Sequence, residues 1–439
     1  MRSIALFAEL LVLLPIAMVR PFVGVLLWSW ISFMNPHRLV YGGIADQPWA
    51  MITFVATMIG CVIAREPKRF PVNALTILIG LFLVMISFTS MFALAPWANV
   101  EAKWEAVFKV FLFLLVTAGL LTSRERIHAL IWVMVISLAY FGIKGGGFTL
   151  LGGGANRVYG PVDTMIQDNN HLATALLVCI PLMNYLRIES KHAIIRYGFI
   201  AAMVLTLFAV VGSYSRGAFV ALAAVAGYFW LKSPNKIVSG TLLAILLVVA
   251  LAFMPATWIE RMHSIEEYQQ DASAAARLEV WHTAWVMATS RPLVGGGFFA
   301  TYWQPVVSLF VPGAGTRAVH SIWLEVLGEH GFPTFFVWVG MSIAGAVYAR
   351  RTIKRATGVP GLEWCVTLAK MTQVSMIAYL VGGSFLSLCY WDYYFTILVA
   401  VSAVDQHVTA TLGSTSERRF AIHAPRQRLA LSRSAGSLG

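Results

Sequence analysis

The segment "VVGSYSRGAFVALAAVAGYFWLK", residues 210–232, is apolar along most of its length and carries charges only at Arg216 and Lys232. Residues 197–215, which lead into the arginine, are uncharged. Similar uncharged blocks recur along the chain, and many reach or approach the ~20 residues that a helix needs to cross a bilayer. The apolar residues come in blocks rather than at the helical or strand spacing of a soluble domain. The segment therefore predicts a membrane-spanning helix with an arginine at its mouth.

Composition points the same way. Of 439 residues, 59% are hydrophobic and 12% are charged, about half of the ~25% charged residues usual in a soluble domain. An outer-membrane barrel requires alternating polarity over ~10-residue segments, which this sequence lacks. We therefore predict an all-α polytopic membrane protein that is embedded in the lipid bilayer. The net charge of +12 is explained by membrane topology, so no nucleic-acid partner is expected.

The candidate spans follow from these apolar blocks. The first two are short and are separated only by Arg20 and Pro21, so twelve or thirteen transmembrane helices are expected. The candidates are residues 3–19, 21–34, 48–64, 71–91, 106–122, 127–142, 171–187, 194–212, 216–231, 237–254, 331–349, 364–388 and 391–404.

Basic loops predict the orientation. Pairs of spans separate the most basic segments, so all of these segments fall on one side, which the positive-inside rule makes cytoplasmic. They are "REPKR" (65–69), "TSRER" (122–126), "RIESKHAIIR" (187–196), "KSPNK" (232–236) and "RRTIKR" (350–355). We expect three parts: N-terminal transmembrane helices at 1–150, a core at 151–405 that includes a long outer loop at 255–330, and a disordered cytoplasmic tail at 406–439.

Arg216 lies at the outer end of its span. Residues 217–231 give ~23 Å of helix against a hydrocarbon core of ~30 Å. Arg216 is therefore either an interfacial anchor or a group that faces a polar cavity. Its neighbours Tyr214, Ser215 and Gly217 favour the cavity, and a guanidinium at a helix N-terminus is suited to phosphate.

The long outer loop carries a second arginine. Arg277 has Trp281 four residues on and Trp285 eight residues on, so one helical face combines a guanidinium with two indoles. Spacing alone favours an interfacial helix that lies on the lipid headgroups. The functional alternative is a lid over a lipid-linked substrate.

A histidine on the same side completes the set of candidates. His320 precedes an apolar helix, and Glu325 and Glu329 follow on a different face of that helix. Histidine is the side chain best suited to proton transfer near neutral pH. The structural alternative is a capping or solvated histidine. Because Arg216, Arg277 and His320 all map to one side of the membrane, the catalytic interpretation gains weight.

Several other motifs give weaker evidence about function. The Gly-rich loop 143–170 lacks GK[ST] and is not a Walker loop, and "GGGFFA" (295–300) lacks the βαβ context of a dinucleotide site. Asn169 and Asn170 are expected to cap the following helix. The sequence contains no CxxC, HExxH, GxSxG or metal-spaced cluster, so no metal or other cofactor is expected.

In this order, the motifs resemble the O-antigen ligase/polymerase superfamily of bacterial membrane glycosyltransferases over roughly residues 160–350. The resemblance rests on "SRG" (215–217), Arg277 with Trp281, "RPLVGGG" (291–297), "HSIWLEVLGEHG" (320–331) and "GPVDTMIQDNNHLA" (160–173). The stretch "RPFVGVLLWSWISFMNPHRLVYG" (20–42) is similar to a subgroup of O-glycosylation ligases associated with exosortase systems.

The resemblance implies a metal-independent glycosyltransferase of the bacterial inner membrane. Such an enzyme would move a glycan from an undecaprenyl-pyrophosphate donor to an acceptor hydroxyl at the periplasmic face. Arg216 and Arg277 would bind the pyrophosphate, and His320 would act as the base. Asn170, Tyr214, Trp281 and Glu325 are further substrate-binding candidates. Ser321 stands where the family typically has Asn, which leaves the acceptor less certain.

Alternatives stay open at this point. The acceptor is a protein Ser or Thr, the lipid A-core as in O-antigen ligases, or a growing chain as in a polysaccharide polymerase. A flippase or transporter of lipid-linked sugars is an alternative of another class, for which charges along the middle of several spans would be expected. Here the charges gather at the outer ends, which favours the enzyme, although Lys109 in span 106–122 is an exception.

Overall fold

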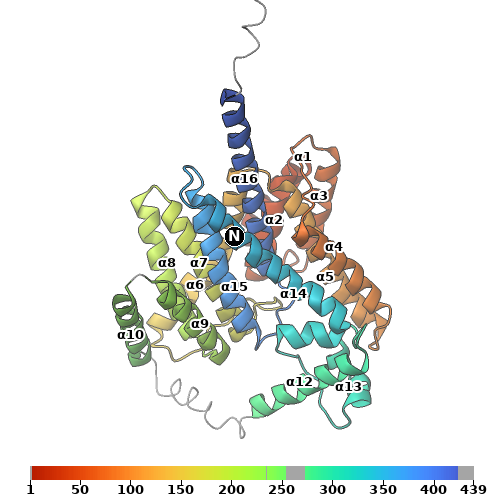
Figure 1. Cartoon of the computed structure of the whole chain (residues 1–439). Helices are drawn as coiled ribbons and strands as arrows, with labels where there is room; N and C mark the ends of the chain where they lie inside the picture. Colours follow the sequence, from red (N-terminus) through yellow and green to blue (C-terminus); the bar gives the residue numbers. More distant parts are fainter. Residues whose placement is uncertain (1, 234, 254–271, 424–439) are drawn as a thin grey trace, which may run out of the picture.

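The computed structural model describes residues 2–233, 235–253 and 272–423, and all regular secondary structure in these ranges is helical. The membrane helices form one bundle, and the helices of the outer loop lie at one end of it (Figure 1). The helices are α1 (Arg2–Val19), α2 (Pro21–Met34), η1 (Pro36–Leu39), α3 (Trp49–Ile63), α4 (Ala74–Ser90), α5 (Trp97–Leu120), α6 (Arg124–Leu151), α7 (Asn169–Glu189), α8 (Ala193–Val211), α9 (Arg216–Lys232), α10 (Lys236–Phe253), α12 (Ala272–Ser290), η2 (Ala300–Tyr302), α13 (Gln304–Phe310), α14 (Ile322–Ala356), α15 (Glu363–Gly383) and α16 (Asp392–His423).

The predicted all-α polytopic fold is confirmed, since every predicted span falls on a helix. By length and hydropathy, seven helices of the described ranges can cross a membrane, which are α1, α6, α7, α8, α14, α15 and the first part of α16. This number is lower than the predicted twelve or thirteen. α2, α3 and α4 are apolar but have fewer than 18 residues, and α5, α9 and α10, which hold three other predicted spans, are also not among the seven.

Three helices extend past their predicted spans toward the outer loop. α5 begins at Trp97 rather than 106, α6 continues to Leu151 rather than 142, and α14 begins at Ile322 rather than 331. α14 is kinked at Gly331, whose φ is 74°. The extensions carry polar side chains beyond the apolar blocks, which is why a search for uncharged runs does not include them.

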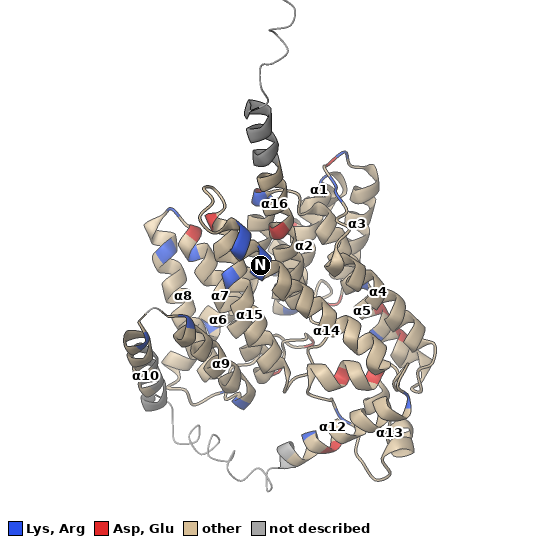
Figure 2. Ribbon diagram, in the orientation of Figure 1, with Lys and Arg blue, Asp and Glu red and all other residues tan. Residues whose placement is uncertain are grey.

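Most of the basic loops meet at one end of the bundle, here called the basic end. Arg126 contacts Glu66 at 2.6 Å, Arg124 contacts Glu189 at 3.4 Å, and the Arg69 N–H donates to the Gly119 carbonyl at 2.9 Å. The predicted grouping of 65–69, 122–126 and the start of 187–196 is thus confirmed. Figure 2 shows Lys and Arg on the loops beside the end from which α16 projects, opposite α12 and α13.

α16 shifts the start of the predicted tail. The helix runs to His423, so residues 406–423 are helical rather than disordered, and residues 424–439 lie outside the described residues. Tertiary contacts explain the longer helix. Arg351 donates to Asp405 at 2.8 Å, His407 lies against the Trp364 ring, and Arg355 donates to Thr409 at 3.1 Å.

The first half of α16 lies at the centre of the bundle. All residues from Trp391 to Asp405 are buried, and the Tyr394 ring stacks on that of Tyr379 in α15 at 3.7 Å. Around this centre, helices approach closely at glycines. Gly146 of α6 faces the backbone of Leu205 in α8, where a Cβ would lie 2.0 Å from the carbonyl oxygen. Small residues at such contacts allow membrane helices to pack backbone to backbone.

Neighbouring glycines in α6 provide a matched test of this packing. Gly146→Ala should destabilise the protein by about 1–3 kcal/mol, because the new methyl group forces α6 and α8 apart. Gly147→Ala should be neutral or slightly stabilising, since no atom lies within 4 Å of that Cβ position and Ala favours helix by up to about 1 kcal/mol. Thermal unfolding in detergent measures the stability of both variants. Equal midpoints would contradict the close packing of α6 against α8 at Gly146.

Candidate functional site

The turn before α9 fixes the position of Arg216. Tyr214 has a φ of 61°, and its hydroxyl donates to the Gly154 carbonyl at 2.6 Å. Ser215 caps the helix by accepting the Ala218 N–H at 3.1 Å. Arg216 is therefore the first residue of α9 and is partly exposed beside a fully buried cap. Arg216 is thus at the N-terminus of α9, the end of a helix at which the dipole favours anions.

Two other segments hold this turn in place. The Asn169 side chain, at the start of α7, donates to the Ser213 carbonyl at 2.6 Å. Gly217 lies against Phe385, so that a Cβ there would be 3.3 Å from the Phe385 Cβ. Phe385 belongs to the segment 384–391 that joins α15 to α16. The mouth of α9 is thus fixed between the start of α7 and this connecting segment.

The connecting segment also holds His320. The His320 N–H donates to Ser387 Oγ at 2.9 Å, and the residue has a left-handed φ of 52°. This backbone conformation is strained for a residue with a side chain, and such strain gathers at functional sites. The Nδ1 atom is buried and has no hydrogen-bond partner among the described residues. Arg216 and His320 therefore both flank the segment 384–391, although 104 residues separate them in the sequence.

His171 lies next to His320, with 6.5 Å between the ring centroids. Its Nδ1 atom is 3.4 Å from Asp168 Oδ1. Asp168 also accepts the backbone and side-chain N–H groups of Asn170, both at 2.8 Å. Asp168 is thus the N-cap of α7, rather than the predicted Asn169 or Asn170. Asn170 donates to the capping carboxylate.

Burial would raise the pKa of the Asp168 carboxyl, but hydrogen bonds from His171 and Asn170 hold it below its ordinary value. Sequence analysis did not single out His171 or Asp168. The run "DNNH" (168–171) contained the signal, because a carboxylate three residues before a histidine at a helix start can orient its ring.

Arg277 and Trp281 reach this region from α12. The Trp281 indole N–H donates to the Val319 carbonyl at 2.8 Å, directly before His320. Burial lowers the pKa of His320 below its ordinary 6.5, and the charges of Arg277 and His171 lower it further. A lowered pKa favours the neutral imidazole at pH 7, the form that can accept a proton. Of the predicted residues, Arg277, Trp281 and His320 come together in this way.

Glu325 lies in a buried ion cluster that sequence analysis missed. Lys103, from the early turns of α5, contacts Glu325 at 3.1 Å and Glu329 at 2.7 Å. The Tyr390 hydroxyl donates to Glu329 at 2.7 Å, and the Lys103 ammonium lies 5.4 Å from the Tyr390 ring. These residues, with Glu325 and Glu329 almost fully buried, join α5, α14 and the segment 384–391. Glu325 thus has a structural partner that its sequence context did not reveal.

The motif "RPLVGGG" supports the same part of α14. The Gly296 N–H donates to the Gly328 carbonyl and the Gly297 N–H to the Glu329 carbonyl, each at 2.8 Å. A Cβ on Gly295 would lie 2.6 Å from the Gly328 carbonyl oxygen. The glycines therefore allow two backbones to meet at the α14 kink.

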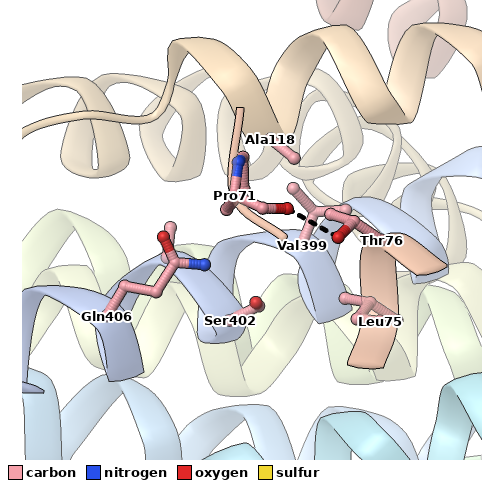
Figure 3. A pocket seen from close by; sticks show the side chains of 8 residues that line it. Pro71, Leu75, Thr76, Ala118, Val399, Ser402 and Gln406 are labelled. Carbon is pink, nitrogen blue, oxygen red and sulfur yellow. Dashed lines mark hydrogen bonds between the residues drawn. The ribbon is translucent and has the colours of Figure 1, made fainter. Parts of the chain in front are cut away.

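Two hollows in the described ranges are lined by none of Arg216, Arg277 and His320. The first lies between α4, α5 and α16 and has no room for a water molecule. Figure 3 shows its labelled residues, with the Thr76 hydroxyl donating to the Pro71 carbonyl at 2.6 Å. The second has a volume of about 310 Å³ and lies beside the end of α6. Within the described residues, no three His, Cys, Asp or Glu side chains are grouped so that they could hold a metal ion.

Two lysines of α5 test the buried cluster. Lys103→Met should destabilise the protein by about 3–5 kcal/mol, because it leaves two buried carboxylates without their cation. Lys109→Met should cost no more than about 1 kcal/mol, since Lys109 pairs with Glu105, whose side chain is 50% exposed. Thermal unfolding of both variants in the same detergent makes the comparison, and a small effect of Lys103→Met would show that the cluster is not a major source of stability.

Comparison with known proteins divides the chain into two parts. Residues 1–191 match a model described as a family of unknown function (DUF5935), which leaves the exosortase-associated subgroup a prediction. No curated protein matches the chain. Residues 201–339, which contain Arg216, Arg277 and His320, match the family model described as O-Antigen ligase. This match supports placing the chain in the O-antigen ligase/polymerase superfamily, a class of membrane proteins that ligate or polymerise glycans.

Proposed function

We propose that the protein transfers a glycan from an undecaprenyl-pyrophosphate donor to an acceptor hydroxyl. The position of His320 carries this proposal. Its neutral ring lies beside His171, within the electrostatic reach of Arg277, and its backbone is held by Ser387. Two residues before Ser387, Phe385 packs against the turn that presents Arg216. His320 and the turn that presents Arg216 thus both flank the segment 384–391, and the charge of Arg277 reaches His320, which supports the proposal.

The two arginines suit the pyrophosphate. Arg216 adds a forked donor to the N-terminus of α9, and Arg277 brings a second cation from the outer loop. Negative charge develops on the leaving pyrophosphate oxygen as the anomeric C–O bond breaks, and fixed cations stabilise that charge. In this scheme the guanidinium groups neutralise the leaving group, so the chemistry needs no metal ion.

His320 completes the exchange of bonds. The acceptor hydroxyl attacks the anomeric carbon and gives its proton to His320, while undecaprenyl pyrophosphate leaves with the electron pair of the broken bond. General-base catalysis of this kind contributes about 10²–10⁴-fold to a rate. Among the further candidates, Trp281 holds the backbone next to His320, and Asn170 orders the Asp168 cap beside His171.

The basic loops favour a bacterial inner-membrane location with the site facing the periplasm. For the acceptor we favour a protein Ser or Thr, on the resemblance of residues 20–42 to O-glycosylation ligases. The lipid A-core and a growing polysaccharide chain are the alternatives within the class.

Transfer by purified protein tests the proposal. His320→Ala should lower the rate of glycan transfer from the lipid-linked donor about 10²–10⁴-fold, because the base is lost. Arg216→Lys should also impair transfer, since an ammonium cannot form the forked contact. His192→Ala, which changes an exposed histidine at the basic end, is the matched control and should be fully active.

Unchanged transfer in folded His320→Ala would remove this residue from the mechanism. Movement of lipid-linked glycan across vesicles without any transfer would indicate a transporter instead.

The pH profile tests the role of His320 separately. The base works when deprotonated, and its pKa lies below 6.5, so kcat/KM should be level at neutral pH and fall only as the pH drops through that lowered pKa. His171→Gln should move this acid limb to higher pH, because it removes a neighbour that disfavours protonation. Asp168→Asn should move the limb to lower pH, because it removes a carboxylate that favours protonation. Rates of transfer measured across the pH range give the acid limb of the wild type and of both variants. A wild-type midpoint above pH 6.5 would contradict the assignment of this limb to His320.

A further inference from the structure

A second hollow is lined by none of the proposed catalytic residues. Its volume of about 310 Å³ is at the lower end of the range of ligand pockets in proteins. It lies between the last turns of α6 and the segment 157–161, and its lining includes Leu39, Phe141, Lys144, Phe148, Arg157 and Tyr159. Three aromatic rings and two cations thus share one cavity, which we call the α6 cavity.

The α6 cavity is positively charged. Lys144 and Arg157 line it, and no acidic residue does. Among the described residues neither cation has a carboxylate partner, and both rest on aromatic rings. The Lys144 ammonium lies 6.0 Å from the Tyr140 ring, and the Arg157 guanidinium lies 5.8 Å from the Tyr214 ring. Neighbouring Asp163 instead contacts Arg38 at 3.5 Å. Two uncompensated cations at one opening favour an anionic ligand.

The wall of the cavity is fixed by backbone hydrogen bonds. The Val158 N–H donates to the Gly212 carbonyl at 3.1 Å, and the Gly160 N–H donates to the Gln167 carbonyl at 3.0 Å. These bonds hold the segment on both sides of Tyr159. A wall that is already ordered loses little conformational entropy when a ligand binds.

The position of Lys144 along α6 places the cavity at the depth of the lipid headgroups. Arg124 begins the 28-residue helix at the basic end. Lys144 is 20 residues further on, which is about 30 Å of helix, the thickness of the hydrocarbon core. Phe148 is 49% exposed and Tyr159 is 56% exposed, so apolar rings surround the opening. Cations beside exposed aromatic rings at this depth match the phosphate and upper chain of a lipid.

We propose that the α6 cavity binds the phosphate of an anionic membrane lipid. Lys144 and Arg157 contact the phosphate, and Phe141, Phe148 and Tyr159 contact the apolar part of the headgroup region. Neither Arg216 nor Arg277 lines this cavity, and the proposal does not depend on glycan transfer, although Arg157 and Val158 contact the turn that precedes Arg216. A free phosphorylated molecule would offer the same anion without the apolar part.

Lipid retention tests the proposal. The full-length protein is exchanged into mixed micelles of phosphatidylglycerol and phosphatidylcholine, and bound lipids are counted by native mass spectrometry. The wild type should retain phosphatidylglycerol preferentially. Lys144→Gln/Arg157→Gln should weaken that binding about fivefold for each cation removed, the factor expected for a basic residue near an anionic surface.

Two further variants separate the cavity from general charge. Arg317→Gln/Lys191→Gln removes the same net charge from exposed positions elsewhere and should retain phosphatidylglycerol like the wild type. Leu39→Trp keeps both cations but fills the cavity, so it should lose the preference even where the double variant fails to fold. Equal loss in the control double variant, or full retention in Leu39→Trp, would overturn the proposal.

Inorganic phosphate distinguishes the two sources of the anion. If the lipid is the ligand, phosphate alone should compete weakly, because it lacks the part that contacts the aromatic wall. Binding of inorganic phosphate together with equal retention of the two lipids would overturn the lipid assignment.

Discussion

The lack of water in the bilayer is the constraint on which this structure depends. Every backbone N–H and C=O group at membrane depth needs a partner inside the protein, which leaves helices as the form the spans take. Irregular backbone is tolerated only where other protein segments satisfy it. At the outer-loop end, Val158 bonds to Gly212, Gly296 bonds to Gly328, and His320 bonds to Ser387. The non-helical segments therefore satisfy one another, and one of these bonds holds His320, which has a left-handed φ of 52°.

The same constraint explains why the charged residues are grouped as they are. A lone cation in a low-dielectric interior is costly. Lys103 is accordingly paired with Glu325 and Glu329, and Glu329 also accepts a hydrogen bond from the Tyr390 hydroxyl. The cluster fixes the first turns of α14 against α5, and the glycine motif fixes the other side of the same turns. His320 directly precedes this braced helix. For the proposed role of His320 as the base, a backbone held at several points keeps the ring in place more precisely than an open loop would.

Much of the fold was readable from the sequence, because hydrophobic length is a local property. The apolar blocks located the helices, and the spacing of basic loops correctly grouped three segments at one end. The boundaries of α5, α6 and α14 were misjudged, since their outer turns are polar and packing rather than hydropathy makes them helical. The start of the tail was misjudged for the same reason, because Arg351 and Trp364 stabilise helix beyond residue 405.

The sequence by itself determined that the chain is a helical membrane protein, and the order of its motifs gave the resemblance to O-antigen ligases from which Arg216, Arg277 and His320 were predicted. These features depend on residue type and spacing along the chain. Only the tertiary structure decided which groups surround His320, since His171 comes from α7, Arg277 from α12 and Ser387 from a connecting segment. Likewise, Lys103 and Glu329 are 226 residues apart in sequence and 2.7 Å apart in space. Contacts of this kind arise from how helices pack against one another, and no local pattern in the sequence specifies that packing.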